Sequence, residues 1–136
     1  MLRPCPDDWV LVPGRDAAGH VAVGMSPAWD LAPSSRSGLG EPIYAAAAGL
    51  VVPPTGRGYS EWGTYCRVQH VGGLETGYAH LSDLSVVVGQ FVLGGQVIGL
   101  AGDSGLARGV HLHFETWLDG TRIDPAPYMG LPGGGQ

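Results

Sequence analysis

The stretch VHLHFETWLDGTRID, residues 110–124, decides the fold of this chain. Side chains of a β-strand point alternately to two faces, so a strand over 110–118 separates apolar from polar side chains. The first face carries Leu112, Phe114 and Leu118 with Thr116, and the second carries His111, His113, Glu115 and Trp117. The pair Asp119-Gly120 is typical of the type I′ turn between antiparallel strands. The stretch therefore predicts a β-hairpin with two histidines on one face of its first strand.

The two histidines of this strand have two interpretations. A rise of ~3.3 Å per residue places their Cβ atoms about 6–7 Å apart. At that separation one ring can bind a metal while the other contacts a metal-bound water or an oxyanion. The alternative is that both are ordinary residues on a solvated strand face. The pair alone does not decide between them.

Segments nearer the N-terminus predict further short strands. They are the apolar segment 42–52, the alternating segments 64–71 and 72–81, and the apolar segment 95–102. Gly72-Gly73 between two alternating runs indicates a second hairpin. Residues 1–40 are expected to be irregular, with at most one turn of helix in SPAWDLA, residues 26–32. We therefore predict an all-β, antiparallel single domain, an open sheet or sandwich with long loops.

Composition supports this fold class and narrows the possible partners. The 136 residues include 24 Gly and 11 Pro, and 14% are charged, which favours short strands and tight turns over a helical bundle. The net charge of -5 and the scattered basic residues argue against a nucleic-acid partner. The longest apolar run is too short to cross a bilayer, so membrane insertion is not expected. Cys5 and Cys66 either form a disulfide or remain free thiols.

Two other segments carry residues that suit a reactive site. TGYAHLS places His80 near the end of a predicted strand, and GHVAVGMSPAWDLAP contains His20 and Asp30. Alone, each pattern is as typical of a structural histidine or a loop. Catalytic zinc sites usually use three His, Asp or Glu ligands and leave the fourth position to water. His20, Asp30 and one histidine of the pair supply such a set, and the remaining histidines are then candidates for acid–base or oxyanion roles.

At these residues the chain resembles the M23 family of zinc metallopeptidases, the lysostaphin/LytM-type peptidoglycan endopeptidases. The resemblance covers most of residues 20–128. It rests on four blocks in a fixed order: EPIYAAAAGLVV, GYAHL, the long segment that ends in HLHFETW, and GTRIDPAPYM. It implies a LytM/lysostaphin-like fold of the duplicated-hybrid-motif type, a Zn²⁺ cofactor and hydrolysis of peptide bonds in bacterial peptidoglycan.

The resemblance also assigns roles by position. It implies that His20, Asp30 and His113 bind zinc, and that His80 and His111 act on water and the oxyanion. Candidates for the walls of a substrate groove are Trp29, Tyr44 and Tyr78, with Tyr59 and Trp62 more typical of packing. Glu115 follows a ligand histidine by two residues, so we expect a supporting or surface residue and not the catalytic base.

One position departs from the commonest family pattern. The family usually has its first histidine ligand four residues before the aspartate, where this chain has Ser26. A serine hydroxyl is a poor zinc ligand. Some members carry the histidine nine or ten residues before the aspartate, and His20 fits that variant. If His20 is not a ligand, the alternative is a catalytically inactive M23-like domain that binds the cell wall or activates a partner.

The expected organisation is an irregular segment 1–19, a peptidase domain 20–129 and a Gly-rich tail 130–136. We expect a monomer that acts at the cell wall, with a cell-wall-binding domain following in a longer chain. The N-terminus lacks the pattern of a signal peptide, which fits either a phage endolysin or a mature or truncated secreted enzyme. A biotinyl- or lipoyl-type carrier domain is excluded because the sequence contains no lysine to modify.

Overall fold

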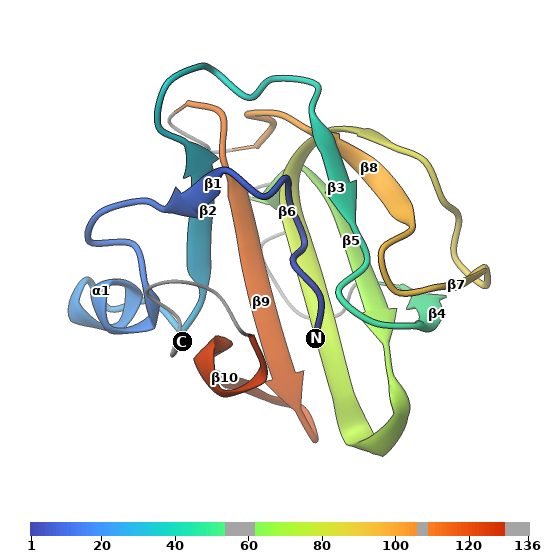
Figure 1. Ribbon diagram of the computed structural model, residues 1–136. Coiled ribbons are helices and arrows are strands. Elements are labelled where there is room, and N and C mark those ends of the chain that lie inside the picture. The colour runs from blue at the N-terminus through green and yellow to red at the C-terminus, as the bar shows by residue number, and fades with distance from the viewer. Residues whose placement is uncertain (54–61, 106–108, 130–136) are drawn as a thin grey trace.

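The computed structural model describes residues 1–53, 62–105 and 109–129, and antiparallel strands dominate it (Figure 1). The strands are β1 (Trp9–Leu11), β2 (Trp29–Pro33), β3 (Pro42–Tyr44), β4 (Gly49–Val52), β5 (Thr64–Gln69), β6 (Leu74–Leu84), β7 (Phe91–Val92), β8 (Val97–Ala101), β9 (Leu112–Leu118) and β10 (Thr121–Ile123). Helical segments include α1 (Ala17–Ala22) and the short 3-10 turns η1 (Val71–Gly73) and η2 (Ala126–Tyr128). The predicted all-β, antiparallel fold is confirmed.

Strands β6 and β9 form the centre of the sheet (Figure 1). The order along its main path is β1-β2-β9-β6-β5-β4-β7, with β10 beside β9 and β8 joining β3 to β6. The 11-residue strand β6 pairs with β5 and β9 over most of its length and with β8 at its end. The pairing Ala79↔His113 places the next residue, His80, beside the histidines of β9.

The two faces of β9 alternate as the sequence predicts, but neither of them is solvated. Leu112 and Phe114 are fully buried in the core, where the Phe114 ring lies 5.4 Å from the ring of Tyr78. On the opposite face His113 is 2% exposed and Glu115 is 1% exposed. The interpretation of the pair as ordinary residues on a solvated strand face is therefore wrong for His113. A buried histidine beside a buried carboxylate needs specific partners.

Both predicted hairpins are present. Thr121 pairs with Leu118 across the turn at Asp119 and Gly120, whose φ angles of 49° and 83° are the positive values that a type I′ turn requires. Strands β5 and β6 pair antiparallel around Gly72-Gly73, and both glycines again have positive φ. The β9–β10 turn fixes the register of the strand that carries the histidine pair.

The N-terminal region differs from the expectation of an irregular segment. Residues 1–40 contain β1, α1 and β2, and the SPAWDLA segment contributes to strand β2 and not to a helical turn. The helix lies earlier, over Ala17–Ala22, where the side chain of Asp16 caps it by accepting a hydrogen bond from Gly19 N. The apolar segment 42–52 forms two separate strands, β3 and β4. Strands β1 and β2 were not predicted from the sequence. Strand β2 is stabilised by its pairing with β9, and such long-range pairing leaves no local sequence pattern.

Of the two arrangements open to the cysteines, the structure has free thiols. Cys5 and Cys66 are both buried in the core. Burial raises the pKa of each thiol to about 12, which keeps both protonated at neutral pH. Among the residues that the structure describes, no helix has the length and apolar character that a membrane span needs.

Candidate metal centre

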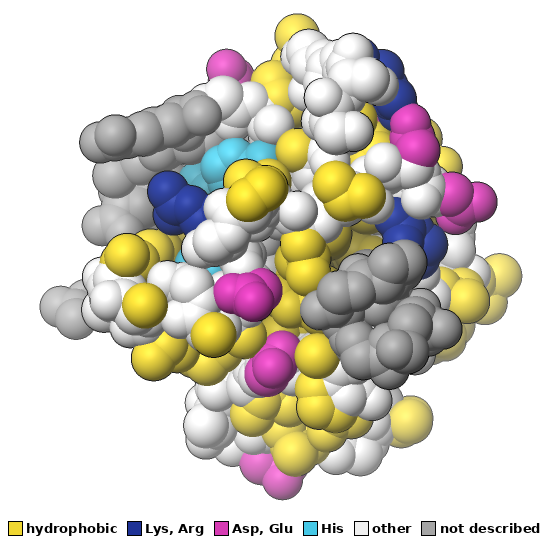
Figure 2. All heavy atoms as spheres, turned by 60° about the vertical axis from the view of Figure 1, so that its left-hand side comes forward, with side chains coloured by type: hydrophobic (Ala, Val, Ile, Leu, Met, Phe, Trp, Pro, Cys, Tyr) yellow, Lys and Arg dark blue, Asp and Glu magenta, His cyan; other side chains and the backbone are white. Residues whose placement is uncertain are grey.

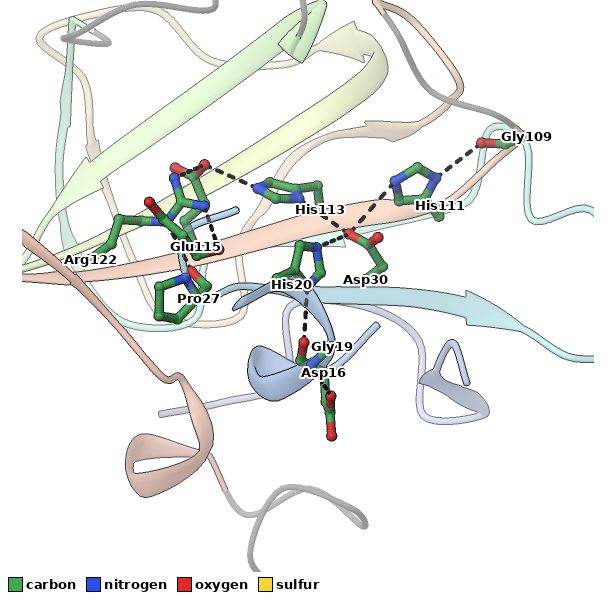
Figure 3. A network of polar contacts seen from close by, with 11 residues as sticks. Asp16, Gly19, His20, Pro27, Asp30, Gly109, His111, His113, Glu115 and Arg122 are labelled. Atoms are coloured by element: carbon green, nitrogen blue, oxygen red, sulfur yellow. Dashed lines mark hydrogen bonds and ion pairs between the residues drawn. The ribbon is translucent and has the colours of Figure 1, made fainter. Parts of the chain in front are cut away.

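His20 enters the site from helix α1. Its Nδ1–H donates a hydrogen bond to the carbonyl of Asp16 at 2.9 Å, which leaves the lone pair of Nε2 free. Nε2 points toward Asp30 and lies 3.4 Å from Oδ1, longer than a good hydrogen bond (Figure 3). The side chain is 1% exposed, and Nε2 has no hydrogen-bond partner among the described residues. A buried nitrogen without a partner is costly and indicates that a ligand belongs there.

A tight turn holds His20 beside Asp30. Arg15 N donates to Val12 O at 2.8 Å across Pro13-Gly14, and the φ of 74° at Gly14 fits a type II turn. Asp30 N donates to Arg15 O at 3.0 Å. A Cβ on Gly19 would lie 1.9 Å from the carbonyl oxygen of Gly14, so helix α1 contacts this turn directly. The turn and the helix therefore form one unit that is tied to the backbone of Asp30.

His113 reaches Asp30 through the pairing of β2 with β9. The two residues are directly opposite in the register, and His113 Nδ1 lies 3.1 Å from Asp30 Oδ1. Burial opposes ionisation of Asp30, but the nearby imidazoles of His113 and His20 outweigh burial and keep the pKa of the carboxyl below its ordinary value. The ring of Trp62 stacks on His113 with a centroid separation of 4.3 Å. The carboxylate is thus ionised and shared between two imidazoles.

These three side chains fit a zinc ion. One potential ligand atom from each of His20, Asp30 and His113 lies within 4.8 Å of the others. In a tetrahedral site with bonds of ~2.0–2.1 Å, ligand atoms are roughly 3.3 Å apart. The contacts from Asp30 Oδ1 to His20 and His113, 3.4 and 3.1 Å, are close to that value. The unpartnered Nε2 of His20 gains a partner when a cation is bound.

Glu115 fixes the orientation of His113. It accepts hydrogen bonds from His113 Nε2 at 3.0 Å, Tyr65 OH at 2.7 Å, Trp117 Nε1 at 3.2 Å and Arg122 Nη1 at 2.8 Å. Burial would raise the pKa of Glu115, but these donors outweigh burial and lower it to about 2. The ionised carboxylate therefore keeps a proton on Nε2 and aims Nδ1 at the site, the carboxylate–histidine arrangement common around zinc. Glu115 is a supporting residue, as expected, and it is not on the surface.

His80 and His111 lie side by side next to this set, with ring centroids 4.8 Å apart. His80 Nδ1–H donates to Ser104 O at 2.8 Å, and burial lowers the pKa of His80 to about 4. At neutral pH His80 is therefore uncharged, and its Nε2 is a proton acceptor. His111 contacts Gly109 O through Nδ1 at 3.1 Å, and its Nε2 lies 3.7 Å from Asp30 Oδ1.

The backbone of His80 adopts an unusual conformation. Its φ of 63° lies in the left-handed region, which is uncommon for residues other than glycine. The register of β6 against β5 shifts between Tyr78 and Leu81, around this position, and its register against β8 shifts just beyond, between Leu81 and Asp83. An irregularity of this kind re-aims a side chain, and here it directs an imidazole from the sheet into the site.

An open cleft of about 400 Å³ contains the five predicted residues. Its lining includes His20, Asp30, His80, His111 and His113. Figure 2 shows histidine side chains in a hollow of the surface, with a basic side chain at its edge. Residues from four distant parts of the sequence, in α1, β2, β6 and the start of β9, therefore meet at one solvent-accessible place.

None of the three predicted groove residues belongs to the described lining of the cleft. Trp29 is 1% exposed and Tyr78 is 0% exposed, and the Tyr78 hydroxyl accepts a hydrogen bond from Ala46 N at 2.9 Å inside the core. Both predictions are wrong, because each ring lies on the core side of its strand. Tyr44 is half-buried on β3 and is not part of the cleft lining. Tyr59 lies outside the described residues.

The cleft has walls that the sequence did not identify. Trp62, for which packing was expected, lines the cleft, and so do Arg15 and Met25. The stacking of Trp62 on His113 could not be found by strand parity, because Trp62 precedes its strand. Ser26 is not part of the described cleft lining, whereas His20 is, and the backbone carbonyl of Ser26 accepts a hydrogen bond from Arg122 Nη2 at 3.3 Å.

A first prediction concerns the contact between Gly19 and Gly14. Gly19→Ala places a methyl group against a backbone carbonyl, so helix α1 must shift and carry His20 away from Asp30. We expect the free energy of unfolding to fall by roughly 1–3 kcal/mol and the zinc affinity to fall with it. Denaturant unfolding and competition with a chromophoric chelator measure the two quantities. Ala18→Ser, on the exposed side of the same helix, should change neither, and an unchanged zinc affinity in Gly19→Ala would contradict the assignment of His20 as a ligand.

A second prediction concerns Glu115. Glu115→Gln removes the charge that holds the Nε2 proton of His113, so zinc affinity should fall about 10- to 100-fold. Glu75→Gln removes the carboxylate charge that is paired with Arg67 at 2.7 Å, and it serves as the matched control. Equal zinc affinities of the two variants would show that Glu115 does not act through His113.

The same substitution has a pH signature in the zinc-free protein. Because the folded-state pKa of Glu115, about 2, lies below its ordinary value of 4.5, its stabilising effect is complete above about pH 4.5. That effect is lost as the pH falls toward 2. The free energy of unfolding of Glu115→Gln should therefore depend less steeply on pH between 4.5 and 2 than that of the wild type.

Comparisons with known proteins agree with this geometry. A model of peptidase family M23 matches residues 29–125, a range that His20 precedes. The DD-carboxypeptidase/endopeptidase Mpg of Neisseria meningitidis is 38% identical over 93 residues, which cover 68% of this chain and 21% of that protein. The chain therefore spans about a fifth of the length of this relative.

Solved structures show the same fold. A zinc-containing peptidase from Vibrio cholerae is similar with a TM-score of 0.69 and 29% identity, over 90% of this chain and 37% of that chain. The catalytic domain of lysostaphin from Staphylococcus simulans is similar with a TM-score of 0.65 and 30% identity, over 77% of this chain and 79% of that domain. With the family match extending over more than half of the sequence, this chain belongs to peptidase family M23.

Proposed function

We propose that this chain is a zinc metalloendopeptidase that hydrolyses peptide bonds in the stem peptides or cross-bridges of bacterial peptidoglycan. The observation that carries the proposal is the buried His20–Asp30–His113 set next to two further histidines in an open cleft. Within this set His20 Nε2 has no hydrogen-bond partner among the described residues. Relatives support the substrate, because they are described as a DD-carboxypeptidase/endopeptidase and as lysostaphin. A structural neighbour described as zinc-containing supports the metal.

The hydrogen bonds of the site residues indicate a different role for each of them in the proposed reaction. Zinc, held by His20, Asp30 and His113, would polarise the scissile carbonyl and lower the pKa of a bound water to about 7. His80 is neutral and presents a free Nε2, so it is suited to orient the attacking water and to accept its proton. His111 lies beside it at the open side of the cleft and is placed to stabilise the oxyanion. One or both histidines then return the proton to the leaving amine.

The proposal includes the place of action and the partners. We propose that the chain works as a monomer at the cell wall, whether it derives from a phage endolysin or from a secreted enzyme. A wall-binding domain in a longer chain would bring this small catalytic domain to its substrate. The alternative, an inactive M23-like module, had Ser26 as its only support. His20 lies with Asp30 and His113 in the cleft, and Ser26 is not among the described lining residues, so the geometry favours the enzyme.

A third prediction tests the activity directly. Purified peptidoglycan of several chemotypes should release new free amino groups in the presence of the protein, and a zinc chelator should stop the release. His80→Ala should lower kcat by roughly 10²- to 10⁴-fold, because it removes the proton acceptor without removing a zinc ligand. His20→Ala should remove zinc binding as well as activity.

A buried histidine outside the cleft provides the matched control. His70 contacts Ala48 O and Thr76 Oγ1 far from the zinc set, so His70→Gln should retain zinc and activity wherever its fold is intact by circular dichroism. No release from any wall by the zinc-loaded protein would contradict the proposed function and favour the binding module.

A further inference from the structure

We propose that Arg15 forms a subsite for a carboxylate of the substrate, and that this chain therefore prefers peptidoglycan peptides with free carboxylates over glycine-only bridges. The inference rests on the proposed function and deepens it. Arg15 and Asp30 are the charged residues of the described cleft lining, and Asp30 belongs to the metal set. Arg15 is thus the basic group available to a ligand in that part of the cleft.

The guanidinium of Arg15 has no partner among the residues that the structure describes. Its side chain is exposed and makes no hydrogen bond or ion pair with any of them. Two other described arginines differ in this respect. Arg36 pairs with Asp8 and Glu41, and Arg122 pairs with Glu115. In a chain of net charge -5, an arginine that lines the cleft without a carboxylate partner is available to bind an anion.

The backbone of Arg15 is fixed although its side chain is free. Its N–H donates to Val12 O, and its carbonyl accepts from the N–H of Asp30, the central ligand of the metal set. The contact between Gly19 and Gly14 locks the same turn against helix α1. The Cα of Arg15 is therefore held beside Asp30, in the lining of the cleft that also contains His80 and His111. A substrate that lies along the cleft and presents its scissile carbonyl to the two histidines passes this arginine.

Carboxylates are the anionic groups of peptidoglycan peptides that such an arginine can recognise. Stem peptides carry them on their acidic residues and at their C-terminus, whereas the interior of a polyglycine bridge has none. The planar guanidinium can bind a carboxylate with two parallel hydrogen bonds. Because Arg15 is exposed, solvent screens the contact, and we expect a preference of about tenfold and no absolute specificity.

A fourth prediction compares two forms of one substrate. Soluble cross-linked muropeptides with free carboxylates, and the same material amidated with carbodiimide and ammonia, share their scissile bonds and differ in charge. Wild-type protein should cleave the free form with a kcat/KM about tenfold higher than the amidated form. Arg15→Gln should lose that advantage through a higher KM on the free form, with little change on the amidated form. Arg15→Lys keeps the charge without the planar fork and should retain part of the preference.

A control variant separates the local contact from net charge. Thr121→Glu changes the net charge by the same one unit as Arg15→Gln, on exposed β10 at the far end of β9 from His111. It should behave as the wild type. Equal losses of Arg15→Gln on both substrates, or cleavage of both forms at one rate by the wild type, would overturn the carboxylate subsite while leaving the hydrolase intact. Absence of any chelator-sensitive cleavage would contradict the proposed hydrolase and the subsite together.

Discussion

The pairing of β2 with β9 at Asp30 and His113 is the constraint on which the rest of the site depends. Antiparallel register places these two residues directly opposite each other, so one carboxylate oxygen lies 3.1 Å from an imidazole nitrogen without any loop having to position them. The remaining groups are arranged around this pair. The turn before helix α1 is hydrogen-bonded to the backbone of Asp30, and β6 supplies His80 from the other side of β9. If the register between β2 and β9 shifted by one residue, one of these two side chains would point to the core face, and the three potential ligands would no longer lie together.

Buried charge would make this arrangement unstable without compensation. Asp30 and Glu115 are both buried carboxylates on one face of the sheet, and each is surrounded by donors. Glu115 is satisfied within the protein by Arg122, Tyr65, Trp117 and His113. The set around Asp30 is not satisfied to the same degree, because His20 Nε2 has no hydrogen-bond partner in the part of the chain that the structure describes. The Glu115 network therefore needs no ligand to satisfy its polar atoms, whereas the His20–Asp30–His113 set needs a cation.

Much of the fold could be predicted from the sequence, because its signals are local. The alternation in β9 and the glycine-containing turns at residues 72–73 and 119–120 predicted both hairpins correctly. Strand β2 and helix α1 were missed, since pairing with β9 and capping by Asp16 stabilise them more than any periodic pattern does. The five site residues could be named from their chemistry and their order. Their distances depend on register and on one left-handed residue, which a sequence does not reveal.

The groove residues show where residue type misleads. Aromatic side chains suit both cores and binding grooves, and Trp29 and Tyr78 proved to be core residues because of the face of the strand on which they lie. Arg15 precedes helix α1 and Trp62 precedes strand β5, so neither of these cleft residues follows the alternation of a strand. The alternation of β9 correctly predicted that Glu115 lies on the same face as His113. Its four donors come from β5, β9 and β10, and only the assembled sheet brings them together.

The left-handed backbone of His80 has a consequence for how this protein can be improved. A side chain in that conformation costs roughly 1–2 kcal/mol, which a glycine at the same position would not. Selection for thermal tolerance alone therefore favours the loss of the imidazole to which we assign proton transfer. A more robust variant must gain its stability elsewhere, in the core or in the surface turns. At this position the residue best suited to the backbone conformation, glycine, lacks the side chain that the proposed reaction needs.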